Sequence, residues 1–226
     1  MSAHAWAPAL AASGLLAWRM LQSVRGQAAQ RRAVLDDCTA LLGEPSVHDH
    51  GTDYPCLRGR YGGAQVEVQP LLDHVGFRKL PSVWLLLTLR APLPVPGRLD
   101  VLMRPQNIEF YADDGAPEGR RFDLPDDWPP HHLARVDPPH WEPPLAALRE
   151  AVQPLLDDQS LKQLLLTPRG LRLVVRAGGV RRADYLVLRS LMPEQPRIPA
   201  ALLQGALEAA LRVRGVLSST EPIRTP

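Results

Sequence analysis

Residues 161–190 constrain the fold of this chain most strongly. Two apolar runs, residues 161–167 and 171–176, are separated by Pro168-Arg169-Gly170. Proline presets the first central position of a turn, and glycine accepts a positive φ that other residues resist. Two apolar runs joined by such a turn are typical of a β-hairpin. A third apolar run at 185–188 follows Gly178-Gly179 and predicts a further strand.

The remaining periodicity predicts more strands and three helices. The predicted strands cover residues 57–61, 64–69, 83–90, 99–103, 161–167, 171–177 and 184–189, and the predicted helices cover about 17–42, 145–156 and 199–213. Consecutive strands joined by tight turns must pair antiparallel, because a parallel crossover needs a dozen or more residues. The sequence therefore predicts an α+β protein with a mainly antiparallel sheet and helices packed on one face.

The two halves of the chain share an order of helix, hairpin, basic loop and apolar strand. If this similarity reflects duplication, the sheet consists of two related helix–three-strand units. Short basic loops before strands are common, however, so coincidence also explains the shared order. We expect an N-terminal helix over residues 1–43, a single α+β domain over 44–218 and a flexible tail over 219–226.

Half of the 24 prolines fall between Pro92 and Pro144. Proline removes a backbone donor and disfavours helix. The same stretch contains Trp128 and Trp141 and is too apolar for a free linker. We interpret residues 92–144 as an ordered cover of turns and extended chain laid over the core.

Charge and cysteine content exclude several classes of protein. A net charge of +2, scattered basic residues and 5% aromatic residues argue against a nucleic-acid partner. Cys38 and Cys56 are too few for a disulfide framework, which favours a reducing compartment and buried thiols.

The N-terminal segment leaves two interpretations open. Residues 5–17 are all apolar or small, and Arg19, Arg25, Arg31 and Arg32 follow them. A spanning helix needs about 20 apolar residues, and this run is shorter. Positive residues behind it would hold the rest of the chain in the cytoplasm. A single N-terminal membrane anchor and an exposed amphipathic helix both fit, so we expect a cytoplasmic protein with or without a tether to the inner membrane.

The histidines suggest a metal site or an acid–base catalytic site, but neither kind of site has its full set of residues in the sequence pattern. His48, His50 and Cys56 lack a fourth ligand at zinc-site spacing, so we expect no metal and no cofactor. His132 lies near carboxylates, but no nucleophile motif accompanies it. The sequence favours a non-catalytic protein- or ligand-binding module. The alternative is a hydrolase or transferase with a site built from sequence-distant residues, such as His74 or His132.

Two basic loops are the candidate ligand site. Arg78 and Lys79 precede one predicted strand, and Arg181 and Arg182 precede another. In a chain with only two lysines, a retained Lys79 points to a need for a compact ammonium. These four side chains could bind a phosphate or carboxylate. Solvated loops paired with nearby aspartates are the alternative. The expected partner is a protein or a small anionic ligand.

Several short stretches resemble a family of uncharacterised bacterial proteins from GC-rich proteobacteria. The stretches are Phe77-Arg78-Lys79-Leu80-Pro81 with Trp84, Met103-Arg104-Pro105, and Pro168-Arg169-Gly170-Leu171-Arg172 with Tyr185 and Arg189. The resemblance covers residues 54–215 and implies an anchored, cytoplasm-facing domain, without an activity. The type III secretion chaperones, α+β proteins that bind effector chains, are one concrete form of the binding hypothesis.

Overall fold

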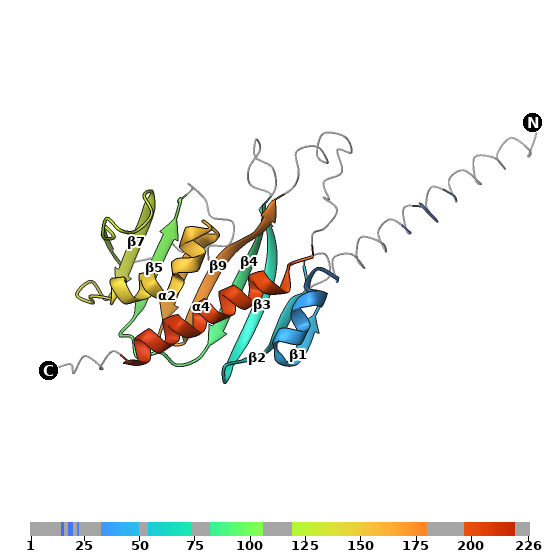
Figure 1. Ribbon diagram of the computed structural model, residues 1–226, viewed down its shortest axis with the longest axis horizontal. Coiled ribbons are helices and arrows are strands. Elements are labelled where there is room, and N and C mark those ends of the chain that lie inside the picture. The colour runs from blue at the N-terminus through green and yellow to red at the C-terminus, as the bar shows by residue number, and fades with distance from the viewer. Residues whose placement is uncertain are drawn as a thin grey trace, which may run out of the picture.

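The protein is an α+β fold built on one large antiparallel sheet in the computed structural model (Figure 1). The structure describes Leu15, Trp18, Arg19, Gln22 and residues 33–49, 54–73, 82–105, 119–179 and 197–219. The strands are β1 (Gly43–His48), β2 (Cys56–Tyr61), β3 (Ala64–Asp73), β4 (Ser82–Arg90), β5 (Arg98–Met103), β6 (Arg120–Phe122), β7 (His132–Asp137), β8 (Leu161–Thr167) and β9 (Gly170–Gly179).

The strand order across the sheet is β1-β2-β3-β4-β9-β8-β5-β7-β6. The strand pairs β2–β3, β3–β4 and β8–β9 are hairpins. The pairs β4–β9 and β5–β8 instead bring together strands that are far apart in the chain. The later hairpin therefore lies between β4 and β5, in the middle of the sheet.

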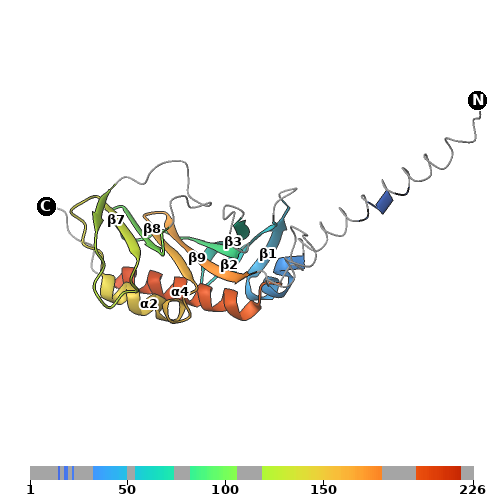
Figure 2. The same ribbon diagram turned by 90° about the horizontal axis from the view of Figure 1, so that it is seen from above.

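A helical layer covers one face of this sheet (Figure 2). It contains the 3₁₀ helix η2 (Ala33–Leu41), α2 (Leu145–Asp157) and α4 (Ala200–Ser219). Leu203, Leu207 and Val213 of α4 are fully buried, and small residues such as Ala206 and Ala210 between them allow close approach to the sheet. Their partners are the alternate leucines of β4, at 85, 87 and 89, and of β9, at 171 and 173. The side chains packed between these helices and the sheet form the hydrophobic core.

The structure confirms the predicted α+β class and the mainly antiparallel sheet. Six of the predicted strands occur: five have ends within two residues of those expected, and the sixth, β3, extends four residues further, to Asp73. Helix α2 matches its predicted range despite Pro154 inside it, and α4 continues to Ser219. The predicted strand at 184–189 lies outside the described residues, so the relation between two helix–three-strand units stays a prediction.

Two expectations need correction. Within the helix predicted over about residues 17–42, residues 33–41 form a 3₁₀ helix and not an α-helix, and Gly43 begins β1. Leu15, Trp18, Arg19 and Gln22 are helical, and the other residues from 17 to 32 lie outside the described part. The segment 92–144 is more than a cover, because besides the predicted strand β5 it supplies β6 and β7 at one end of the sheet. The sequence did not predict β7, because its short alternation of apolar and polar residues lies between proline-rich turns.

No helix in the described part of the chain is both long and apolar enough to cross a membrane.

Candidate functional site

The sheet has a second face, turned away from α2 and α4, which we call the outer face (Figure 2). Because side chains alternate along a strand, every second residue of each strand points to this face. The register aligns one such residue from every strand in a single row: Ser46, Arg58, Glu67, Thr88, Arg172, Leu165, Asp100, Arg135 and Arg121. The row is polar except at Leu165, whereas the residues beside it on the other face of β3, β4, β9 and β8 are core leucines and valines.

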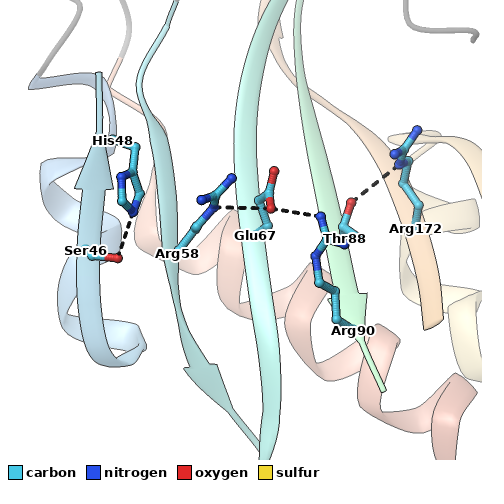
Figure 3. A network of polar contacts seen from close by, with 7 residues as sticks. All are labelled: Ser46, His48, Arg58, Glu67, Thr88, Arg90 and Arg172. Atoms are coloured by element: carbon cyan, nitrogen blue, oxygen red, sulfur yellow. Dashed lines mark hydrogen bonds and ion pairs between the residues drawn. The ribbon is translucent and has the colours of Figure 1, made fainter. Parts of the chain in front are cut away.

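Glu67 is the centre of a polar network in this row (Figure 3). Its Oε2 accepts a hydrogen bond from Nη2 of Arg90 at 3.1 Å and pairs with Nε of Arg58 at 3.3 Å. Beside it, Nε of Arg172 donates to Oγ1 of Thr88 at 3.4 Å. The network places guanidinium groups from β2, β4 and β9 on one surface.

Two adjoining open grooves follow these residues. One has a volume of about 530 Å³ and is lined from β1 to β4, and the other has about 230 Å³ and is lined from β4 to β5. They share Arg90. We call the two together the arginine groove. Its charged lining residues are six arginines and two glutamates: Arg58, Arg60, Arg90, Arg98, Arg169, Arg172, Glu44 and Glu67.

The groove carries an excess of positive charge. Arg98 pairs with Asp100 at 3.1 Å, and Glu67 serves both Arg58 and Arg90. Within the described ranges, Arg60, Arg169 and Arg172 form no ion pair. Partial burial raises the pKa of Glu67, but the hydrogen bond from Arg90 and the charges of Arg58 and Arg90 outweigh it and hold that pKa below its ordinary value. Glu67 is therefore a stable carboxylate that leaves positive charge on both sides uncompensated.

The other end of the outer face is apolar. Trp84, Leu86 and Val174 form a small buried cluster, with Leu71 and Leu102 packed against it. The outer face thus changes from apolar to basic along the strands, toward the β2–β3 and β8–β9 turns.

The predicted ligand residues Arg78, Lys79, Arg181 and Arg182 lie outside the described residues. The described strand ends next to them are neighbours, since Ser82 pairs with both Asp73 and Gly179. The sequence reasoning missed the arginine groove. A signal was present, because Arg58 and Arg60 occupy alternate positions of the predicted strand 57–61, and Arg172 interrupts the apolar run of the predicted strand 171–177.

The candidate metal and acid–base residues do not converge in the described part of the chain. His48 and Cys56 are directly opposite each other in β1 and β2, and His50 is not described. No group of three or more metal-ligating side chains occurs among the described residues. Nδ1 of His132 lies 3.0 Å from the Pro129 carbonyl, and its Nε2 accepts from the Leu124 amide at 3.2 Å. Both ring nitrogens of His132 thus hold a turn together.

The cysteines are buried, as the sequence predicted. Burial, with a smaller effect from Asp37, raises the pKa of Cys38 to about 11. Burial and then the charge of Glu67 raise the pKa of Cys56. Both therefore remain protonated thiols near neutral pH, which suits packing and not nucleophilic attack.

No protein-family model matches this chain, and neither the curated proteins nor the solved structures that were compared with it include a match.

Proposed function

We propose that the protein is a non-catalytic binding module whose arginine groove binds an acidic segment of a partner protein. The observation that carries the proposal is the basic lining of the two adjoining grooves, with three arginines that no described carboxylate pairs. An acidic segment would supply the missing carboxylates, and guanidinium–carboxylate contacts are strong and directional.

The length of the groove favours a chain over a single small anion. Its lining residues extend from β1 to β5 through β2, β3, β4, β9 and β8. Six steps between neighbouring strands, at about 4.8 Å each, give a span of ~29 Å. About nine residues of extended peptide cover that distance. A phosphate or a short dicarboxylate would contact only two or three of the arginines.

The lining also argues for a peptide over a nucleic acid. The residues that line the two grooves include no aromatic side chain on which bases could stack. Thr88, Thr167 and Gln65 add neutral hydrogen-bonding groups beside the arginines. Such a surface suits carboxylates alternating with backbone amides.

A non-catalytic role is supported by the state of the side chains that could act as catalytic groups. Ser46 Oγ lies 3.3 Å from Nε2 of His48, but no described carboxylate orients this histidine. The thiol nearest the groove, Cys56, is buried and protonated. His132, named in the hydrolase or transferase alternative, is engaged by backbone groups, and His74 lies outside the described residues.

The basic loops are a separate candidate site, because they adjoin the ends of β3, β4 and β9 that are opposite to the arginine groove. We infer that Arg78, Lys79, Arg181 and Arg182 bind an anion there, since the strand ends that precede or follow these loops are adjacent in the sheet. We further propose that the two halves are related units and that the protein acts on the cytoplasmic side of the inner membrane. The family resemblance and the arginines after residue 17 support this location.

The test uses the triple variant Arg60→Gln, Arg169→Gln, Arg172→Gln. These arginines form no ion pair with a described residue, so their loss should leave the unfolding temperature nearly unchanged. A fluorescent ten-residue peptide of alternating glutamate and leucine serves as the probe, titrated by anisotropy. We expect the triple variant to bind at least about tenfold more weakly, since about 1.4 kcal/mol is tenfold in affinity.

The control is the triple variant Arg149→Gln, Arg212→Gln, Arg214→Gln, which removes the same charge from the helical layer. It should bind the peptide as the natural chain does, provided that it remains folded. Equal loss in both variants would overturn the groove as the site, because net charge alone would then explain binding. Tighter binding of inorganic phosphate or of an oligothymidylate than of the peptide would overturn the acidic-segment proposal.

A further inference from the structure

A second cavity lies away from the arginine groove, where β5 and α2 end. It has a volume of about 350 Å³ and is lined by Pro129, Pro130, residues of β5 and β8, and the α2 terminus. Met103, Leu155, Leu156 and Leu161 form its buried apolar floor. Arg104, His131 and Gln159 line its exposed rim. An apolar cavity with few polar groups at its mouth is typical of a small-molecule site.

Backbone strain is concentrated at this rim. Four non-glycine residues of the described chain have positive φ, and three of them are Arg104 (49°), His131 (60°) and Gln159 (56°). Positive φ is uncommon for residues other than glycine, and residues held in this conformation gather at ligand sites. The three are tied together, because the Arg104 amide donates to the His131 carbonyl at 2.7 Å and Nη2 of Arg104 donates to the Gln159 carbonyl at 3.0 Å. The rim is therefore a built structure and not three independent turns.

Arg104 brings positive charge to the rim without a matching carboxylate. Its Nη2 donates to the carbonyls of Gln159 and Leu161, which leaves Nε and Nη1 without a partner in the described ranges. The lining residues include no aspartate or glutamate. Burial and the charge of Arg176 lower the pKa of Arg104. The buried ammonium of Lys162 donates to the Arg104 carbonyl at 2.7 Å and helps to fix this residue.

We propose that this cavity binds a small monocarboxylic acid with an apolar body. The carboxylate would accept from the free donors of Arg104, and the body would contact the floor of Met103, Leu156 and Leu161. The volume equals about a dozen water molecules, which suits an aromatic acid or a short fatty acid. The site is independent of the arginine groove, since no residue lines both.

The test compares phenylacetate with phenylacetamide, which has the same shape and no charge, on the full chain. Isothermal titration should show saturable binding of phenylacetate, with the amide at least about tenfold weaker. In a sample with ¹³C-labelled methionine methyl groups, phenylacetate should shift the resonance of Met103, one of four methionines in the chain. Arg104→Gln should remove the preference for the acid, and Arg104→Lys should keep part of it.

The triple variant of the arginine groove should bind phenylacetate unchanged, so failure of one proposal is distinguishable from failure of the other. Equal affinity for acid and amide in the natural chain would overturn the inference. So would the absence of saturable binding, or a phenylacetate affinity that Arg104→Gln leaves intact. Because the comparison of acid with amide uses the unaltered protein, it decides the question even where a variant fails to fold.

Discussion

At the scale of single residues, Glu67 decides how the arginine groove is organised. Its carboxylate lies between Arg58 and Arg90 on neighbouring strands, and its side chain is 22% exposed. An opposite charge between two guanidinium groups removes their mutual repulsion and fixes where they point. The arginines that Glu67 does not reach, such as Arg60 and Arg172, are those that we assign to the partner.

Glu67→Gln should therefore destabilise the protein in a pH-dependent way. The native state holds the pKa of Glu67 below its ordinary value of 4.5, so this contribution is present above about pH 4.5 and is lost as pH falls through the native pKa. We expect Glu67→Gln to lower the free energy of unfolding by about 1 kcal/mol near pH 7. The difference should narrow towards about pH 3. Urea unfolding at the two pH values measures it.

Glu44→Gln is the matched control for that measurement. Glu44 lines the same groove but forms no ion pair with a described residue. Its replacement should change stability much less than the replacement of Glu67. A Glu67→Gln effect of the same size at both pH values would contradict the assigned ion pairs.

At the scale of elements, the β8–β9 hairpin is the part on which the centre of the sheet depends. Gly170 has a φ of 148° and pairs with Arg90 of β4 as well as with Thr167 of β8. A Cβ atom at this position would lie 2.2 Å from the Leu89 carbonyl oxygen. The turn therefore needs glycine twice, for its backbone angle and for the close approach of β4.

Gly170→Ala should consequently destabilise the fold by about 2–4 kcal/mol, combining strain at positive φ with displacement of β4 from β9. Gly63→Ala is the control, since Gly63 also has positive φ, at 78°, but its added Cβ would meet no atom within 4 Å. We expect only about 1–2 kcal/mol there. Thermal unfolding of both variants measures the contrast. Equal losses would mean that the close approach to Leu89 has no energetic weight.

At the scale of the whole molecule, the small net charge of +2 hides an uneven distribution of charge between the helical layer and the outer face of the sheet. The helices η2, α2 and α4 carry five carboxylates and three arginines, namely Asp36, Asp37, Glu150, Asp157, Glu208, Arg149, Arg212 and Arg214. The arginine groove on the outer face has the opposite balance. Such a separation would orient the acidic partner that we propose towards the groove before contact, an effect that added salt would weaken.

The N-terminal segment bears on where that encounter occurs. The anchor hypothesis predicts that the full chain sediments with membranes and resists carbonate extraction, whereas a variant without residues 1–22 is soluble. The amphipathic-helix hypothesis predicts that carbonate releases the full chain. Fractionation of cells that express either form measures the difference. Equal solubility of the two forms would remove the anchor.

The sequence by itself determined the local structure. Alternating apolar residues with Gly62-Gly63 and Pro168-Arg169-Gly170 specify the β2–β3 and β8–β9 hairpins, because a tight turn forces antiparallel pairing and sets its register. The alternation of apolar and polar residues in β3 also determined which face of that strand is buried. Strands β1, β6 and β7 escaped prediction. Strand β6 has only three residues, and prolines lie within β1 and beside β7, where local propensity points to turns.

Only the tertiary structure decided which segments became neighbours. The pairing of β4 with β9 and of β5 with β8 joins strands that no turn connects, and it depends on how the helical layer buries their leucines together. These pairings bring Arg90, Arg172 and Arg98 into one groove, and the meeting of β5 with α2 brings Arg104 to Gln159. An outer-face arginine contributes little to folding, so its local sequence shows that it is exposed and leaves its neighbours undetermined.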